Sequence, residues 1–276
     1  MIYNYPKLSR YDFGIFRVSG PGLANCLFFV AQAFVASLNN GGKVISPTWA
    51  KFSIGPYLRR EKDKRGYINL FSSFGVTGFK KILILLGYHL GLKSSVQTYD
   101  GLNDYFVSLR PYQEDIKALF DKTVNPEAIS TLAGTDFSNT VAVHVRLGDY
   151  PQDRRVPILW YKAMMERIQQ YNPEVKFALF SDGTDEELKP LTDMSATEKM
   201  FFGNAIADIY AISRCKIVLA SDSTFSAWGG FLGDSILIFN KRHFPAVYDD
   251  SDKEYIIQDA KNVFPQKLIN HISLLN

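Results

Sequence analysis

The chain has 276 residues, of which 46% are apolar, enough for two small α/β domains with a substantial core. Its formal net charge of +3 is too small to indicate a nucleic-acid partner. Cys26 and Cys215 both lie in apolar stretches, which predicts buried thiols and indicates no disulfide framework.

Residues 13–18 alternate and favour a strand, and a Gly/Pro loop follows at 19–22. Residues 25–38 predict a strongly apolar helix that ends at the Asn and Gly residues of 39–42, because these types tolerate the left-handed cap conformation. With a second strand at 43–46, the pattern is a βαβ start and favours a parallel sheet.

Residues 113–124 predict a helix with acids at its start and lysines later. Pro126 and the polar stretch 134–139 mark the best domain boundary. We therefore expect an N-terminal domain at 1–135 and a C-terminal domain at 136–276.

The second half alternates between short apolar strands and amphipathic helices. Its predicted strands span 141–145, 176–180, 200–202, 217–220 and 236–239. Its predicted helices span 159–171, 185–191, 206–214 and 225–232. This alternation predicts a doubly wound parallel sheet, in which ligands bind beyond the carboxyl ends of the strands.

The first candidate motif, His144 to Tyr150, leaves the end of a predicted strand. Alternation places His144 and Arg146 on one face, and Gly148 allows the backbone to turn sharply. The guanidinium of Arg146 offers a rigid fork of donors that matches a phosphate. The alternative is that Arg146 only pairs with Asp149 and closes a loop.

The second motif, residues 221–226, follows the strand at 217–220 and opens a helix. The hydroxyls of Ser223, Thr224 and Ser226 at this helix N-terminus predict an anion site. Ordinary helix capping is the alternative.

Three further segments are candidates. Asp182 lies at a strand end, where an Asp-Gly turn is the alternative. Asp208 lies among apolar residues of a helix, either as a partner of the helix dipole or as a buried reader of a polar ligand. Residues 20–25 form a glycine-rich strand-to-helix turn, which lets a backbone approach a ligand closely but lacks the third glycine of the dinucleotide fingerprint.

Several enzyme classes lack their motifs in this sequence. It has no Walker A segment and no G-x-S-x-G. Its four His and two Cys show no zinc spacing. It also has no clear D-x-D pair of the kind a metal-dependent sugar transferase uses to hold a diphosphate-bound cation.

Taken in order, these pieces resemble the α-1,2-fucosyltransferases of glycosyltransferase family 11. The HVRLGDY of 144–150 is similar to that family's H-x-R-R-x-D-Y, and the STFSAWGG of 223–230 to its S-S-F-S-W-W-G-A. Residues 22–25 resemble the end of G-G-L-G-N, residues 207–215 resemble D-L-x-L-M-S-x-C, and 238–244 occupy the place of a P-x-x-W-F segment.

The resemblance implies a GT-B-type α/β fold with two Rossmann-like domains facing across a donor-binding cleft. It also implies inverting transfer of L-fucose from GDP-fucose to a terminal galactose-type residue of a glycan, in α-1,2 linkage, without a metal or another cofactor. The implied donor-binding residues are Gly22, Asn25, His144, Arg146, Asp182, Asp208, Ser223, Thr224 and Ser226.

Among these residues, Arg146 would bind the donor's β-phosphate and Asp208 would accept hydrogen bonds from guanine. Arg146 is thus a catalytic candidate. Asp149 is the candidate for the catalytic base, with the alternative that it only orients Arg146. Leu147 replaces the second Arg of the family motif and Ala227 the first Trp. These two departures leave room for another GDP-deoxysugar. A further alternative is a catalytically silent glycan- or nucleotide-binding homologue that retains the fold.

Residues 43–93 hold ten Lys or Arg and only two acids. This imbalance predicts either a basic surface, for a membrane face or a lipid-linked glycan acceptor, or a solvated loop. The polar N-terminus carries no signal pattern, and the longest apolar runs, 26–38 and 82–90, are too short to span a bilayer. We therefore expect a cytoplasmic enzyme, peripheral to the inner membrane face where it meets lipid.

Overall fold

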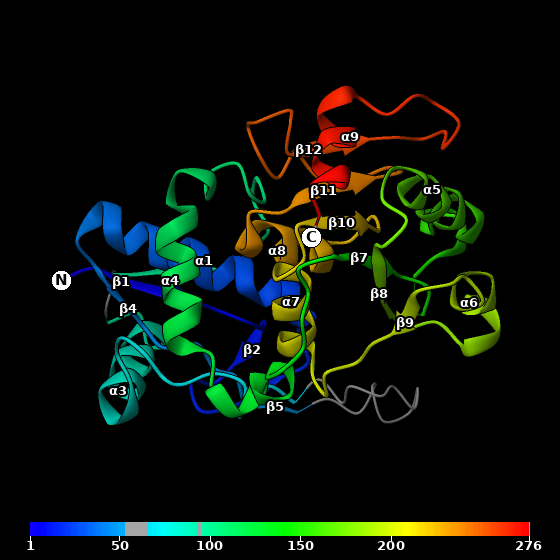
Figure 1. Ribbon diagram of the computed structural model, residues 1–276. Coiled ribbons are helices and arrows are strands. Elements are labelled where there is room, and N and C mark those ends of the chain that lie inside the picture. Colours follow the sequence, from blue (N-terminus) through cyan, green and yellow to red (C-terminus); the bar gives the residue numbers. More distant parts are fainter. Residues whose placement is uncertain (53–65, 93–94, 149, 276) are drawn as a thin grey trace. The chain divides into compact units, whose positions relative to one another are not determined.

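The computed structural model describes residues 1–52, 66–92, 95–148 and 150–275. They form two compact units, residues 1–130 and residues 131–276 (Figure 1). The predicted boundary follows residue 135.

Unit 1 is built on a parallel sheet in which β1 (Tyr3–Pro6) lies between β4 (Lys43–Val44) and β6 (Val96–Tyr99). The helix α1 (Leu23–Asn40) connects β1 to β4 and packs against the sheet. A βαβ unit is therefore present, but its first strand is at the N-terminus and not at 13–18 as predicted.

The segment predicted as one strand at 13–18 contains a turn. The strands β2 (Tyr11–Asp12) and β3 (Arg17–Val18) pair antiparallel, and the amide of Phe13 donates to the carbonyl of Phe16 at 2.9 Å. A two-residue period is the same in a hairpin as in one strand, so the alternation could not reveal the turn. A further short strand, β5 (Lys51–Phe52), pairs parallel with β3.

The helix α1 ends at Gly41, whose φ of 62° is the left-handed cap conformation that the sequence predicts. With 18 residues it is longer than the predicted apolar run, and by length and hydropathy alone it could cross a membrane. However, 61% of it is buried inside the structure, as expected of a core helix. The remaining helices of unit 1 include α3 (Gly78–His89), η1 (Arg110–Tyr112), α4 (Gln113–Thr123) and η2 (Pro126–Leu132), which extends into unit 2.

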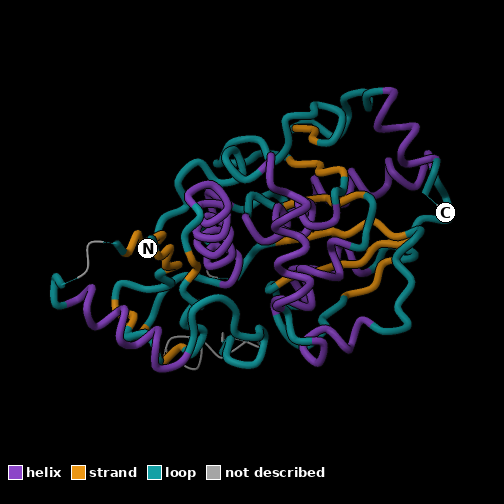
Figure 2. Tube along the Cα trace, turned by 90° about the vertical axis from the view of Figure 1, so that its left-hand side faces the viewer, coloured by secondary structure: helices purple, strands orange, loops and turns teal. Residues whose placement is uncertain are grey.

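Unit 2 contains a six-stranded parallel sheet in the order β12-β11-β10-β7-β8-β9. Its strands are β7 (Thr140–Val145), β8 (Lys176–Ser181), β9 (Thr197–Lys199), β10 (Ile217–Ala220), β11 (Ile236–Phe239) and β12 (Glu254–Ile256). In chain order this is the 3-2-1-4-5-6 arrangement of a dinucleotide-type fold. Figure 2 shows these strands side by side with helices around them. The predicted doubly wound sheet is confirmed.

One predicted strand of unit 2 is displaced. The edge strand forms at Thr197–Lys199 and not at 200–202. Phe202, which suggested a strand, instead contacts the rings of Phe137 and Phe180 at the end of the sheet. The polar residues of β9 are tolerated because this strand pairs on one side only.

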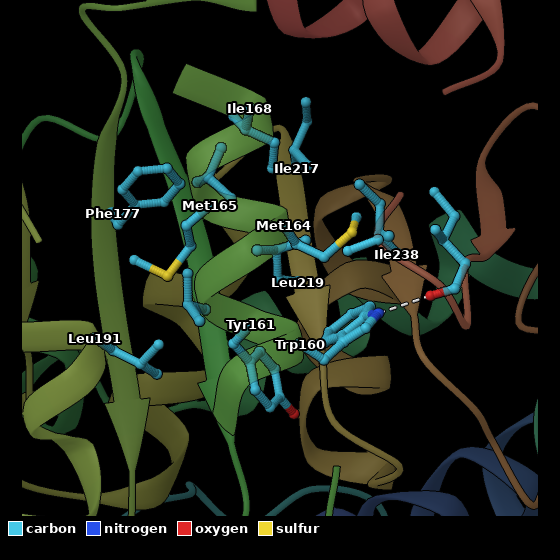
Figure 3. Packing of buried hydrophobic residues seen from close by; sticks show 14 of the residues in the cluster. Trp160, Tyr161, Met164, Met165, Ile168, Phe177, Leu191, Ile217, Leu219 and Ile238 are labelled. Carbon is cyan, nitrogen blue, oxygen red and sulfur yellow. Dashed lines mark hydrogen bonds between the residues drawn. The ribbon is translucent and has the colours of Figure 1, made fainter. Parts of the chain in front are cut away.

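Alternate residues of the strands face two helical layers. Val143, Leu219 and Ile238 belong to one buried cluster with α5 (Ile158–Tyr171), α6 (Asp185–Thr192) and α9 (Gln266–Ser273). Figure 3 shows Met164 and Met165 of α5 in this cluster. The opposite face is covered by α7 (Ala205–Ser213) and α8 (Thr224–Gly233). This packing fixes the carboxyl ends of β7, β10 and β11 at one edge.

Candidate active site

The candidate site lies where the strand order of unit 2 reverses. β7 and β10 are neighbours in the sheet, but the chain leaves β7 toward β8 and leaves β10 toward β11 on the other side. The loops after these two strands diverge, and open α/β sheets bind ligands at such a switch point. Two of the predicted motifs, 144–150 and 221–226, begin at this point.

His144 is the second-to-last residue of β7 and is 6% exposed. Its Nδ1 lies 2.7 Å from the hydroxyl of Ser221, and its ring stacks on Phe225 of α8 with centroids 5.1 Å apart. Burial, and then the charge of Arg146, lower the pKa of His144 to about 3. A neutral imidazole at pH 7 can hydrogen-bond a ligand but adds no positive charge.

Arg146 leaves the end of β7 and forms an ion pair through Nη1 with Oδ2 of Asp182, which follows β8. The other oxygen of Asp182 accepts a hydrogen bond from the amide of Leu147 at 2.8 Å. The side chains of Arg146 and Asp182 are 27% and 31% exposed. Asp182 therefore anchors Arg146 at the sheet edge. Asp149, the partner considered from the sequence and the candidate base, lies outside the described residues.

Two neighbours of Arg146 show why the motif has its residue types. A Cβ atom on Gly148 would lie 2.3 Å from Oδ2 of Asp182, so glycine is needed for space. Gly148 also lies in the expected turn, which the amide of Tyr150 closes by donating to the carbonyl of Leu147 at 3.1 Å, although its φ is not in the left-handed region. Leu147, which replaces an Arg of the family motif, is 4% exposed and packs over Gly183 in the core.

The loop beyond Gly148 is tied by residues that the sequence analysis did not select. Arg155 donates from Nε to the carbonyl of Tyr150 at 3.0 Å and from Nη2 to the carbonyl of Gly148 at 3.1 Å. The hydroxyl of Tyr150 donates to the carbonyl of Asp222 at 2.7 Å. Tyr150 was part of the recognised motif, whereas nothing in the sequence distinguished Arg155 from other exposed arginines.

The hydroxyls at the start of α8 have different surroundings. Ser223 is the N-cap, and its Oγ accepts from the amide of Phe225 at 3.2 Å, so the capping alternative is observed. Ser226 is 0% exposed and donates to the carbonyl of Ser223 at 3.4 Å. Thr224 is 9% exposed. The helix N-terminus itself still presents amide groups and a positive dipole end at the sheet edge.

Asp208 lies in the first turn of α7, whose N-cap is Asn204. Its Oδ1 accepts a hydrogen bond from the amide of Phe202 at 2.8 Å, which fixes the segment before the helix. This position fits the dipole alternative. The guanine-binding role of Asp208 stays a prediction.

Asp222 and His243 form a pair that the sequence did not predict. Oδ1 of Asp222 accepts from the backbone amide of His243 at 2.8 Å and lies 2.7 Å from its Nδ1. The available signal was position, because His243 follows the predicted strand at 236–239, whose carboxyl end shares the edge of the motifs.

The two predicted donor-binding residues of unit 1 lie at the start of α1. Gly22 is its N-cap, with no heavy atom within 4 Å of an added Cβ, and Asn25 is in its first turn. The turn before Gly22 is held by Lys51, whose Nζ donates to the carbonyl of Gly20 at 3.2 Å.

The structure describes four of the ten basic residues of 43–93, and not all of them face solvent. Lys81 is 6% exposed, and its Nζ donates to the hydroxyl of Thr48 at 3.0 Å. Lys43 and Lys80 are exposed and line a pocket of about 480 Å³. The basic segment 59–65 lies outside the described residues.

Both cysteine thiols are buried, as predicted. Burial raises the pKa of Cys26 to about 11 and that of Cys215 to about 12.

Among the residues that the structure describes, no group of three or more His, Cys, Asp or Glu side chains is placed to hold a metal ion.

The family model of glycosyl transferase family 11 matches residues 111–263, more than half of the 276-residue chain. The chain belongs to glycosyl transferase family 11. A search of curated proteins gave no match for this family 11 chain.

This family 11 chain is similar to several solved structures. A crystal structure of NodZ α-1,6-fucosyltransferase soaked with GDP-fucose has 14% identity and a TM-score of 0.51, over 84% of this chain and 91% of that one. Fucosyltransferase NodZ from Bradyrhizobium gives 14% identity and 0.49, over 83% and 90%. E. coli ADP-heptose LPS heptosyltransferase II gives 13% and 0.44, over 94% and 97%. The likeness to the first shows an α/β fold of the GT-B type.

Proposed function

We propose that this family 11 glycosyltransferase is an inverting fucosyltransferase that moves L-fucose from GDP-fucose to a terminal galactose-type residue, forming an α-1,2 linkage. The donor is supported by the motif resemblance to α-1,2-fucosyltransferases and by the likeness to a NodZ structure soaked with GDP-fucose. The linkage is supported by the motif resemblance alone.

The observation that carries the proposal is the arrangement at the switch point. Arg146 is held by Asp182 at the end of β7, and the N-terminus of α8 follows the neighbouring strand β10. When the sugar–phosphate bond breaks, negative charge develops on the departing GDP. A fixed guanidinium and helix amides at that place stabilise the charge, and one such contact contributes about 3–4 kcal/mol in the transition state.

The reaction is proposed to need no metal ion. Its support is the presence of Arg146 beside a helix N-terminus, which can take over the charge stabilisation. The one D-x-D of the sequence, Asp250 and Asp252, precedes β12 at the opposite edge of the sheet, and Asp252 is paired with Lys267. Transfer should therefore proceed at an unchanged rate in EDTA. Loss of activity in EDTA that manganese or magnesium restores would contradict this part of the proposal.

The direct test is the release of GDP from GDP-fucose with and without lactose as the acceptor, beside GDP-mannose, UDP-galactose and ADP-glucose. We expect acceptor-dependent GDP release with GDP-fucose, and an α-1,2-fucosylated product by NMR. Transfer from a UDP- or ADP-sugar in preference to the GDP-sugars would contradict the proposed donor.

A second candidate is a transferase for another GDP-deoxysugar. The observation that favours it is Leu147, because a core leucine stands where the family motif has a second arginine. Higher turnover with a different GDP-deoxysugar would select this function. Thermal stabilisation by GDP without turnover of any donor would instead indicate a silent nucleotide-binding homologue.

The acceptor is proposed to be an oligosaccharide or a lipid-linked glycan, and the enzyme to work in the cytoplasm at the inner membrane face. Lys43 and Lys80 supply exposed positive charge in unit 1. Each lysine near an anionic surface contributes about 1 kcal/mol, screened by salt. Binding to phosphatidylserine vesicles should then weaken steeply as salt rises, and its absence at low salt would contradict the membrane contact.

A further inference from the structure

A buried aspartate and a histidine are joined at the site edge in a way that fixes the hydrogen position on the imidazole. Oδ1 of Asp222 accepts a hydrogen bond from the backbone amide of His243 at 2.8 Å and lies 2.7 Å from the ring Nδ1 of the same residue. An ionised carboxylate only accepts hydrogen bonds, so Nδ1 carries the hydrogen. Proton exchange with a substrate then takes place at Nε2.

The pair lies at the same sheet edge as Arg146. Asp222 follows β10 and His243 follows β11, and β10 lies between β11 and β7 in the parallel sheet. Asp222 directly precedes Ser223, the N-cap of α8. The backbone carbonyl of Asp222 accepts a hydrogen bond from the hydroxyl of Tyr150. The segments proposed to hold the diphosphate and the segment carrying His243 are therefore connected by hydrogen bonds.

The two side chains differ in exposure as an anchor and a reactive group would. The side chain of Asp222 is 7% exposed and that of His243 is 33% exposed. Arg242, the preceding residue, forms an ion pair with the buried Glu254 at 2.5 Å, so its charge is already matched. The ring of His243 also lies edge-on to that of Phe244, with centroids 5.2 Å apart.

We propose that His243, oriented by Asp222, is the general base of the transfer. This inference rests on the proposed function. The acceptor hydroxyl oxygen forms a bond to C1 of the sugar while the bond from C1 to the β-phosphate oxygen breaks, and its electron pair leaves with GDP. The hydroxyl proton moves to Nε2 of His243 and then to solvent. Asp222, a positioning residue, stays hydrogen-bonded to Nδ1 and stabilises the imidazolium that forms.

The experiment compares the parent enzyme with His243→Gln and Asp222→Asn, using GDP-fucose and lactose. We expect His243→Gln to lose about 10²–10⁴-fold in kcat, the usual range for a general base, with unchanged affinity for GDP. Asp222→Asn should lower kcat without raising the KM for the donor, because an amide can donate to Nδ1 and so favours the wrong tautomer. His271→Gln is the control, since His271 is an exposed histidine of α9 in the same unit.

A second variant keeps the test valid if His243→Gln folds poorly. His243→Ala should regain part of its kcat in added imidazole, whereas Asp222→Asn should not, because it still has its own imidazole. Rescue of the first variant only is a result that a structural role would not produce.

Several outcomes overturn the inference. Near-parent turnover in His243→Gln contradicts it directly, and loss of turnover in Asp149→Asn alone would assign the base to Asp149. Weakened GDP binding with unchanged kcat would make His243 a donor-binding residue. A parent enzyme that transfers no sugar from any GDP-sugar overturns the proposed function and this inference with it, and that result is visible before any variant is made.

Discussion

Each of the two units holds an arginine with a defined set of partners, and the two side chains serve different ends. Arg17 of unit 1 is 0% exposed and donates to three backbone carbonyls, those of Thr48 at 3.0 Å, Ser19 at 2.8 Å and Leu8 at 3.4 Å. Arg146 of unit 2 is 27% exposed in its side chain and forms an ion pair with the carboxylate of Asp182.

The difference shows how the partners of a guanidinium decide its role. Arg17 donates to backbone carbonyls of separate segments and to Sγ of Cys26, so it cross-links the chain around the turn before α1. The guanidinium of Arg146 has five donor hydrogens, is held at a sheet edge and is reached by solvent, as a ligand-binding group must be. We therefore expect substitutions of Arg17 to lower stability and substitutions of Arg146 to lower turnover.

The largest expected effect is that of Arg146→Ala on catalysis. Turnover should fall about 10²–10³-fold, because one donor aimed at developing charge is lost. The melting temperature should change little, since a half-exposed ion pair contributes about 0–1 kcal/mol. Arg146→Lys should remain strongly impaired because an ammonium lacks the two-pronged geometry. Turnover and melting temperature, measured on one preparation, distinguish a catalytic role of Arg146 from a structural one. Near-normal specific activity in Arg146→Ala would refute the catalytic assignment.

Arg17→Ala should show the opposite pattern. Each buried carbonyl that loses its donor costs about 1–3 kcal/mol, so urea unfolding should show a marked loss of stability. Arg10→Ala is the control, because Arg10 is exposed in the same unit and should change stability by less than about 0.5 kcal/mol. If Arg17→Ala unfolds like the control and instead loses turnover, the contrast between the two arginines is wrong.

The sequence predicted this contrast only in part. The motif at 144–150 and the strand before it identified Arg146, and the alternating elements predicted the parallel sheet of unit 2. Asp182 was selected, but its pairing with Arg146 joins the ends of two strands, and that contact depends on the register of β7 and β8. Arg17 gave no signal, because it lay in a segment predicted as one plain strand.

The errors of the sequence analysis have physical causes. The strand β1 holds Asn4 and Pro6, both depleted in strands, and it forms because two neighbours and α1 bury it. The pair of Asp222 and His243 joins residues 21 positions apart. Such a contact between loops after adjacent strands follows from the sheet order, which the local pattern does not specify.

A smaller effect is expected from the glycine beside Arg146. In Gly148→Ala the new Cβ would lie 2.3 Å from Oδ2 of Asp182, so the carboxylate must move away from the guanidinium. Turnover should fall by about tenfold, equivalent to about 1.4 kcal/mol, less than in Arg146→Ala because the arginine is still present. Gly66→Ala is the control, since nothing lies within 4 Å of its Cβ. Equal activity in both variants would show that the anchor is unnecessary.

Asp208 is the intermediate case between the two arginines, because it already has a structural partner and is also predicted to bind guanine. Asp208→Asn keeps an oxygen that can accept from the amide of Phe202, whereas Asp208→Ala removes it. If Asp208 reads guanine, both variants should lose about 1–3 kcal/mol of discrimination between GDP and ADP, the scale of one bidentate base contact. Only Asp208→Ala should also have a lower melting temperature. Calorimetric affinities for both nucleotides decide the case, and unchanged GDP binding in Asp208→Asn would place Asp208 with Arg17, as a side chain that holds its own unit together.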